Sequence, residues 1–253
     1  MTPDATGQAD RASAEHHDWP VEAQVLLALL NDVCVAHAPP GIEREMDAII
    51  NQRLAPIAER VWQDAAGNTV ALLPGQAHDQ PLQLTAHKDE IALIVKRIDE
   101  SGRVHVTRAG GLHPFKVGEG PVDILADDGS VVPASLGFGA SHVSEESSIQ
   151  QVKSGGRAAN WSDAVIEAKL TRDELLARGV HVGSRVVLER SRKAPRILQE
   201  YVGAHALDDK GSVALLLLLA EALASEPPPQ DVYLLLTSGE EVASVIAGVK
   251  VTP

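Results

Sequence analysis

The chain has 253 residues, 44% of them hydrophobic, which is enough for one large domain or two modest ones with a real core. Its formal net charge of -13 argues against nucleic-acid and anionic-membrane partners, because phosphate contacts need clustered Lys and Arg. A single cysteine, Cys34, cannot form an internal disulfide, and residues 1–18 lack the apolar stretch of a signal peptide. We therefore expect a cytoplasmic protein.

The first part of the chain has a polar start followed by helical and strand patterns. Residues 1–18 are predicted to be a disordered leader. Apolar residues at helical spacing predict helices over 21–33 and 43–57, and a hairpin is expected over 61–73. A short strand over 82–86 then leads into a run of charged residues.

The middle of the chain has a different character. Residues 97–194 are rich in Gly and Val and carry short β-like runs separated by turn signals, which predicts a small β-rich domain. One helix is expected over 171–177, where Thr171 and Glu174 form a capping-box pattern.

The α/β pattern returns after residue 194. A helix is predicted over 211–224, and a continuous apolar strand over 232–236 is typical of strands buried on both faces of a sheet. The simplest organisation is one α/β domain, residues 19–96 and 195–253, with the β-rich residues 97–194 inserted into it.

Three short clusters carry the residue types that bind metals. They are His87 to Asp89, Asp208–Asp209 and Glu240–Glu241, and each falls near a predicted strand end or helix start. In open α/β sheets, ligands collect beyond the carboxyl ends of the strands. One imidazole together with several carboxylates suits Zn²⁺, Co²⁺ or Mn²⁺.

Each cluster alone has two interpretations. His87 could bind a metal while Asp89 orients its ring, or both could be solvated surface side chains. One residue of the Asp pair could bridge two ions, or the pair could interact with a helix dipole. One residue of the Glu pair could bind a metal while its neighbour acts as general base on a metal-bound water, or both could favour a helix N-terminus.

The order and flanks of these clusters resemble those of the glutamyl and tetrahedral (TET) aminopeptidases, a family of di-metal peptidases of which some members have been named endoglucanases. The resemblance runs from Trp19 to about Val242. The matching segments are Pro40–Glu43, Asp64–Asn68, Ala86–Ile91, Ala109–Gly111, Gly179–Ser184, Ala206–Gly211 and Glu240–Val242.

The resemblance implies a fold and partners. The fold would be an α/β domain with a zinc-peptidase-like mixed sheet and helices on both faces, plus an inserted small β-barrel-like domain. The substrate would be a peptide with a free N-terminus. In the family the inserted domain mediates dimer contacts within a tetrahedral dodecamer, so the resemblance also implies a homo-oligomer.

The resemblance also implies roles for five residues. His87, Asp208 and Glu241 resemble metal ligands, with Asp208 bridging two divalent ions, which are Zn or Co, with Mn as the third option. Glu240 resembles the general base, and Asp89 the residue that steers His87. The peptide bond that follows Asp208 is expected to be cis.

The end of the sequence departs from the family pattern. The family has a further Asp ligand soon after the Glu pair and a final His ligand far downstream, whereas here no Asp or Glu follows Glu241 and no His follows His205. The resemblance therefore implies that the C-terminal part of the α/β domain is missing, and that the strand over 232–236 lies at an exposed sheet edge. Two hypotheses follow: a metal-dependent aminopeptidase whose chain alone could be inactive, or a truncated or degenerate non-catalytic subunit of that family.

Overall fold

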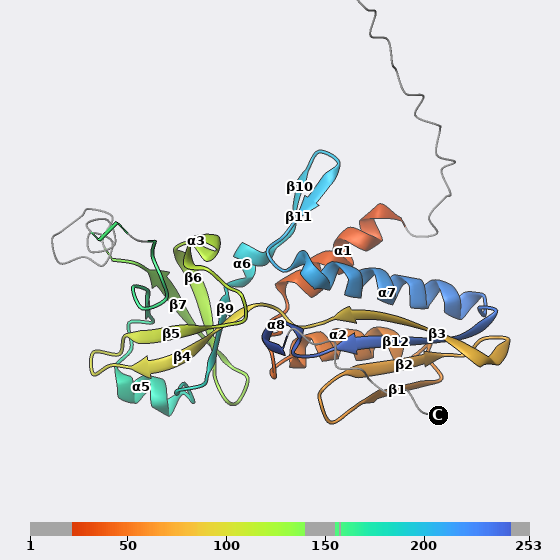
Figure 1. Cartoon of the computed structure of the whole chain (residues 1–253), viewed down its shortest axis with the longest axis horizontal. Helices are drawn as coiled ribbons and strands as arrows, with labels where there is room; N and C mark the ends of the chain where they lie inside the picture. The colour runs from red at the N-terminus through yellow and green to blue at the C-terminus, as the bar shows by residue number, and fades with distance from the viewer. Residues whose placement is uncertain (1–21, 140–154, 157, 244–253) are drawn as a thin grey trace, which may run out of the picture.

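A computed structural model describes residues 22–139, 155–156 and 158–243 (Figure 1). The predicted leader, residues 1–18, lies outside these residues. Figure 1 shows a barrel at one end of the molecule and a sheet with long helices at the other. Among the described helices, none is both long and apolar enough to cross a membrane.

The sheet has four described strands. They are β1 (Arg60–Gln63), β2 (Thr69–Leu73), β3 (Ala77–His87) and β12 (Gln230–Thr237), in the order β1-β2-β12-β3. β1 and β2 form the predicted hairpin. β12 runs antiparallel to β2 and parallel to β3, which makes the sheet mixed.

The expectation that the strand over 232–236 lies at a sheet edge is wrong. β12 lies between β2 and β3, and its apolar side chains are buried. Among the described strands β3 is at the edge instead, and most of its residues are exposed. Pro81 within β3 has no backbone N–H to donate, which suits an edge position and not a central one.

Three helices share one core with the sheet. α1 (Ala23–Val35), α2 (Arg44–Leu54) and α7 (Leu207–Ser225) bury their apolar stripes against the inward side chains of β2, β3 and β12. Cys34 is free and buried in this core. The sequence also predicts helices on the other face of the sheet, and this part of the expectation stays a prediction.

The β-rich part closes into a barrel. Its strands are β4 (Ala92–Ile98), β5 (Val104–Ala109), β6 (Gly120–Leu125), β7 (Val131–Gly137), β8 (Val165–Glu167) and β9 (Arg185–Leu188), in the order β4-β5-β8-β7-β6-β9. Inward Val, Ile and Leu side chains fill it. The predicted helix is α5 (Arg172–Ala177), and Thr171 and Glu174 form the expected capping box.

The remaining elements are short. α3 (Pro114–Val117) follows β5, and α6 (Arg190–Lys193) follows β9. The hairpin of β10 (Arg196–Leu198) and β11 (Tyr201–Gly203) then leads into α7, and α8 (Glu240–Ala243) follows β12. In Figure 1 the ends of β3 and β12 point toward the barrel, so residues at these ends lie where the two parts meet.

Candidate metal centre

The pairing of β3 with β12 brings two of the three clusters together. The strands are parallel, and their last pair aligns Thr237 with His87. Glu240 and Glu241 follow at the start of α8. Ligand atoms of His87, Glu240 and Glu241 lie within 4.8 Å of one another.

The start of α7 brings in the third cluster. The backbone at Asp208 and Asp209 is not helical, and the peptide bond between them is cis, as the resemblance implied. Asp208 directs Oδ1 to 3.5 Å from His87 Nε2, while its side chain is 97% exposed. Asp209 has a different use, because its carboxylate accepts a hydrogen bond of 3.1 Å from the backbone N–H of His87. Asp208 is therefore free to face a ligand, while Asp209 holds the end of β3.

Asp89 connects the two strand ends. It is fully buried, and its two carboxylate oxygens accept hydrogen bonds from the backbone N–H groups of Glu240 (3.2 Å) and Glu241 (3.1 Å). His87 Nδ1 lies 3.2 Å from the Asp89 carbonyl oxygen and 3.5 Å from Oδ1. Asp89 thus contacts the inner side of the His87 ring and leaves Nε2 facing Asp208.

The electrostatics of the centre favour a cation. Burial lowers the pKa of His87, but the hydrogen bond and charge of Asp89, with further charge from Asp209 and Glu240, raise it to about 9. Burial raises the pKa of Glu241 to about 7, against the opposing effect of His87 and with support from neighbouring carboxylates. Crowded carboxylates of this kind gain from a nearby positive charge. An imidazole with carboxylate oxygens is also a donor set that suits Zn²⁺, Co²⁺ or Mn²⁺.

Two segments that matched the family pattern, but had no role from sequence, hold the turn before Glu240. The backbone N–H of Ser238 donates to Asn68 Oδ1 (2.9 Å), and its hydroxyl donates to Glu43. Asn68 is held in turn by Asp64, whose carboxylate accepts from its side chain and backbone N–H, both at 2.9 Å. These contacts fix the path of the chain from β12 into α8.

A glycine in the loop after β5 allows close approach to Glu241. Gly110 has φ +88°, and a Cβ there would lie nearer than 3.0 Å to the Glu241 carbonyl oxygen. A side chain cannot fit between this loop and α8 without moving one of them. The neighbouring Gly111 has no heavy atom within 4 Å of its ideal Cβ position.

Sequence reasoning missed the buried charges on both sides of Asp89. Lys88 is fully buried, pairs with Asp47 of α2, and donates to Thr69 Oγ1 at 3.1 Å. Glu90 is also buried and pairs with Lys193 and Lys210. The only available signal was a run of charged residues directly after an apolar strand, which is equally typical of a strand end at the surface.

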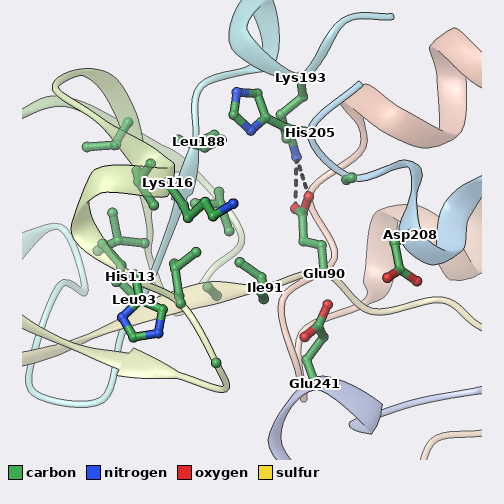
Figure 2. Close-up of a pocket in the computed structure, with 18 residues that line it drawn as sticks. Glu90, Ile91, Leu93, His113, Lys116, Leu188, Lys193, His205, Asp208 and Glu241 are labelled. Carbon is green, nitrogen blue, oxygen red and sulfur yellow. Dashed lines mark hydrogen bonds and ion pairs between the residues drawn. The ribbon is translucent and has the colours of Figure 1, made fainter. Parts of the chain in front are cut away.

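A cavity of about 360 Å³ adjoins the centre. Figure 2 shows Asp208 and Glu241 on one side of it and the barrel on the other. Barrel residues such as Leu93 and Leu188 form an apolar wall. Lys116 of α3 directs its ammonium into the space between the two sides (Figure 2). The cavity could therefore hold a side chain with an apolar stem and a polar or charged end.

Comparison with known proteins gives one family. The family described as M42 glutamyl aminopeptidase matches residues 67–252. SgcX of Escherichia coli (strain K12) is 30% identical over 186 residues, which cover 73% of this chain and 48% of SgcX. The chain spans about half the length of the curated relatives it matches.

Solved structures share the fold. An aminopeptidase of the archaeon Desulfurococcus kamchatkensis aligns with a TM-score of 0.74 at 24% identity, over 86% of this chain and 57% of that one. The TET1 peptidase of Pyrococcus horikoshii, described as assembling into a tetrahedron or a large octahedral shell, aligns with a TM-score of 0.73 at 22% identity, over 86% of this chain and 62% of that one. The expected fold class, a mixed α/β fold with a β-barrel, is confirmed.

Proposed function

The chain belongs to the M42 glutamyl aminopeptidase family, and from this premise we propose that it acts as a metal-dependent aminopeptidase that releases N-terminal residues from peptides. The observation that carries the proposal is the convergence of His87, Asp208, Glu240 and Glu241 at the ends of two adjacent parallel strands and the start of α7. This is where α/β folds place their ligands.

Each residue has a distinct role on this proposal. His87 and Glu241 would each serve as a ligand of one of two divalent ions, Zn or Co with Mn as the third option, and Asp208 would serve as a ligand of both. Bound there, such ions would polarise the peptide carbonyl and lower the pKa of a water molecule. Glu240, whose Oε2 lies 3.8 Å from His87 Nε2, would act as the general base: it would take a proton from the water that attacks the peptide carbonyl and give it to the amine that leaves when the C–N bond breaks. Asp89 keeps the His87 ring and the start of α8 in place.

The cavity receives the first side chain of the peptide. Its apolar wall fits the methylene groups of that side chain, and the ammonium of Lys116 fits a carboxylate at its end. This supports an acidic N-terminal residue, in agreement with the glutamyl specificity in the family's description. Lysine is a single point charge, so the preference should be electrostatic and should weaken with salt.

Copies of the chain associate through the inserted domain, residues 97–194. The support is the description of the TET1 peptidase as a tetrahedral or octahedral assembly, together with the likeness in fold. We place the protein in the cytoplasm, because its one cysteine, Cys34, is free and buried, which suits a reducing compartment.

The test is an assay of the purified protein with added Zn²⁺, Co²⁺ or Mn²⁺ and a panel of aminoacyl anilides. We expect metal-dependent release that is fastest for the glutamyl substrate and is abolished by a chelator. Glu240→Gln should lower the rate by about 10² to 10⁴, whereas Glu226→Gln, an exposed residue after α7, should have no effect. Binding of metal without any turnover would instead support the non-catalytic subunit.

A further inference from the structure

Glu90 lies at the centre of a buried cluster of charged groups. Lys193 donates to Glu90 Oε1 at 2.8 Å and to Oε2 at 3.1 Å, and Lys210 donates to Oε2 at 3.0 Å. The backbone N–H of Ala38 also donates to Oε1 at 3.0 Å. Both ammonium groups further donate to the carbonyl oxygen of Ala36, at 2.8 Å and 2.7 Å. Figure 2 shows the pair of Lys193 and Glu90 beside the cavity.

Glu90 and its two lysine partners come from three separate parts of the fold. Glu90 itself directly follows Asp89 at the end of β3, and Lys210 lies in α7, two residues after Asp208. Lys193 ends α6, which follows the last barrel strand. A single carboxylate thus joins two of the three segments that carry candidate ligands, the end of β3 and the start of α7, to each other and to the barrel.

A second layer of polar contacts surrounds the same junction. Lys193 also donates to His37 Nδ1 at 3.0 Å, and His37 Nε2 lies 3.0 Å from Asp123 of barrel strand β6. Arg190 of α6 forms a bidentate pair with Glu45 of α2 at 2.7 and 2.8 Å. The cluster therefore has partners on the barrel as well as on the sheet side.

Separating buried charges of this kind is strongly destabilising. Glu90, Lys193 and Lys210 are almost completely buried, so a displaced partner would leave a charge without solvent or counter-ion. Burial would raise the pKa of Glu90, but the two lysines hold it down at about 2, and burial lowers the pKa of Lys193 to about 8. At neutral pH Glu90 is therefore ionised and Lys193 mostly protonated, and the attraction persists.

We propose that Glu90 is a positioning residue for the metal centre. Through Lys210 it sets where the start of α7 places Asp208 relative to His87, and through Lys193 it makes that placement depend on how the barrel is seated. The inference rests on the proposed function only in taking His87 and Asp208 as ligands. Glu90 also lines the cavity, and its hydrogen bonds in the described part of the chain go to Lys193, Lys210 and Ala38 and not to His87 or Asp208.

The test compares two Glu→Gln variants at the same junction. Glu90→Gln keeps the size of the side chain and removes the charge shared by both lysines. Glu45→Gln is the matched control, because it breaks the pair with Arg190 across the same junction without touching the segments that carry His87 or Asp208. Both are measured for Co²⁺ affinity, for the visible absorption spectrum of bound Co²⁺, and for the ring nitrogen resonances of His87 in metal-free protein.

We expect folded Glu90→Gln to bind Co²⁺ about tenfold more weakly, the size of effect seen for groups that orient metal ligands, with a changed spectrum and shifted His87 resonances. Glu45→Gln should leave all three unchanged. Equal behaviour of the two variants, or no change in Glu90→Gln, would overturn the proposal. If Glu90→Gln does not fold, Lys193→Met keeps the Lys210 pair, and it should change the same readouts in the same direction. Absence of Co²⁺ binding in the wild type would contradict the proposed function alone, since the His87 resonances of metal-free protein still decide the role of Glu90.

Discussion

Replacing Gly110 by Ala tests how closely the barrel loop must approach the start of α8. Gly110 has φ +88°, and holding the backbone of an alanine in this left-handed conformation costs about 1–2 kcal/mol relative to its preferred conformation. The added Cβ would also overlap the Glu241 carbonyl oxygen, and overpacking of this kind costs about 1–3 kcal/mol. We therefore expect Gly110→Ala to lower the free energy of unfolding by about 2–5 kcal/mol, unless α8 moves and carries Glu241 with it.

Two measurements on the same protein separate these responses. Urea denaturation gives the free energy of unfolding, and calorimetric titration with Zn²⁺ gives the metal affinity. Gly111→Ala is the matched control, because no heavy atom lies within 4 Å of its added Cβ, and it should stay within about 0.5 kcal/mol of wild type. If Gly110→Ala matched this control in both stability and affinity, the close contact with Glu241 would be refuted.

Three further changes follow from single contacts. Asp89→Asn removes a charged acceptor from two N–H groups of α8 and should lower the free energy of unfolding by about 1.5–3 kcal/mol for each weakened bond. Urea denaturation measures this loss, and a loss below about 0.5 kcal/mol would contradict it. Glu90 has a folded pKa of about 2, below its ordinary 4.5, so about 3 kcal/mol of stability is present above pH 4.5 and is lost as the pH falls toward 2. Lys193 has the opposite effect, because its lowered pKa of about 8 is a cost at neutral pH that is relieved only as the pH rises above 8, so Lys193 does not contribute to the loss of stability in acid. Stability should therefore fall more steeply with acid in wild type than in Glu90→Gln, and parallel acid limbs would argue against this. Leu217→Ala, at a fully buried position of α7, should lower the free energy of unfolding by about 2–5 kcal/mol in thermal or urea unfolding. Leu215→Ala, at a 45% exposed position of the same helix, should lower it by less than about 1 kcal/mol, and equal losses would place the core elsewhere.

The sequence predicted the candidate centre because its residues follow recognisable elements. Apolar runs before His87 and Glu240 indicated strands, and parallel strands bring their carboxyl ends to one edge of a sheet. The convergence of the three clusters therefore needed only the element types and the order of the chain. Their roles as ligand, bridge and base stay predictions.

The position of the strand over 232–236 could not be predicted in the same way. Periodicity reports which faces of a strand are apolar, and it does not report which strands are its neighbours. The apolar character of β12 on both faces was compatible with its central place, whereas the edge expectation came from the family's later strands. The polar residues and proline of β3 were the better signal for an edge.

The buried charges were the second thing missed. Lys and Glu are mostly exposed in proteins, so Lys88, Glu90, Lys193 and Lys210 had no reason to be placed inside. Their partners are distant in the chain, for example Glu90 and Lys193, and pairing across such a distance depends on how the barrel packs on the sheet. Gly110 was matched to the family pattern, but no physical role was predicted for it. Its contact with Glu241 exists only in the folded chain.

The most direct test of the account is Zn²⁺ titration of two histidine variants from the same strand. His87→Ala removes the imidazole at the carboxyl end of β3, and His78→Ala removes one near the start of that strand, where the side chain is exposed and pairs with Asp231. The account predicts that wild type and His78→Ala bind Zn²⁺ with the same affinity. His87→Ala should bind it about tenfold to a hundredfold more weakly. Equal affinities in all three proteins, or no binding by the wild type, would contradict a metal centre at the ends of β3 and β12.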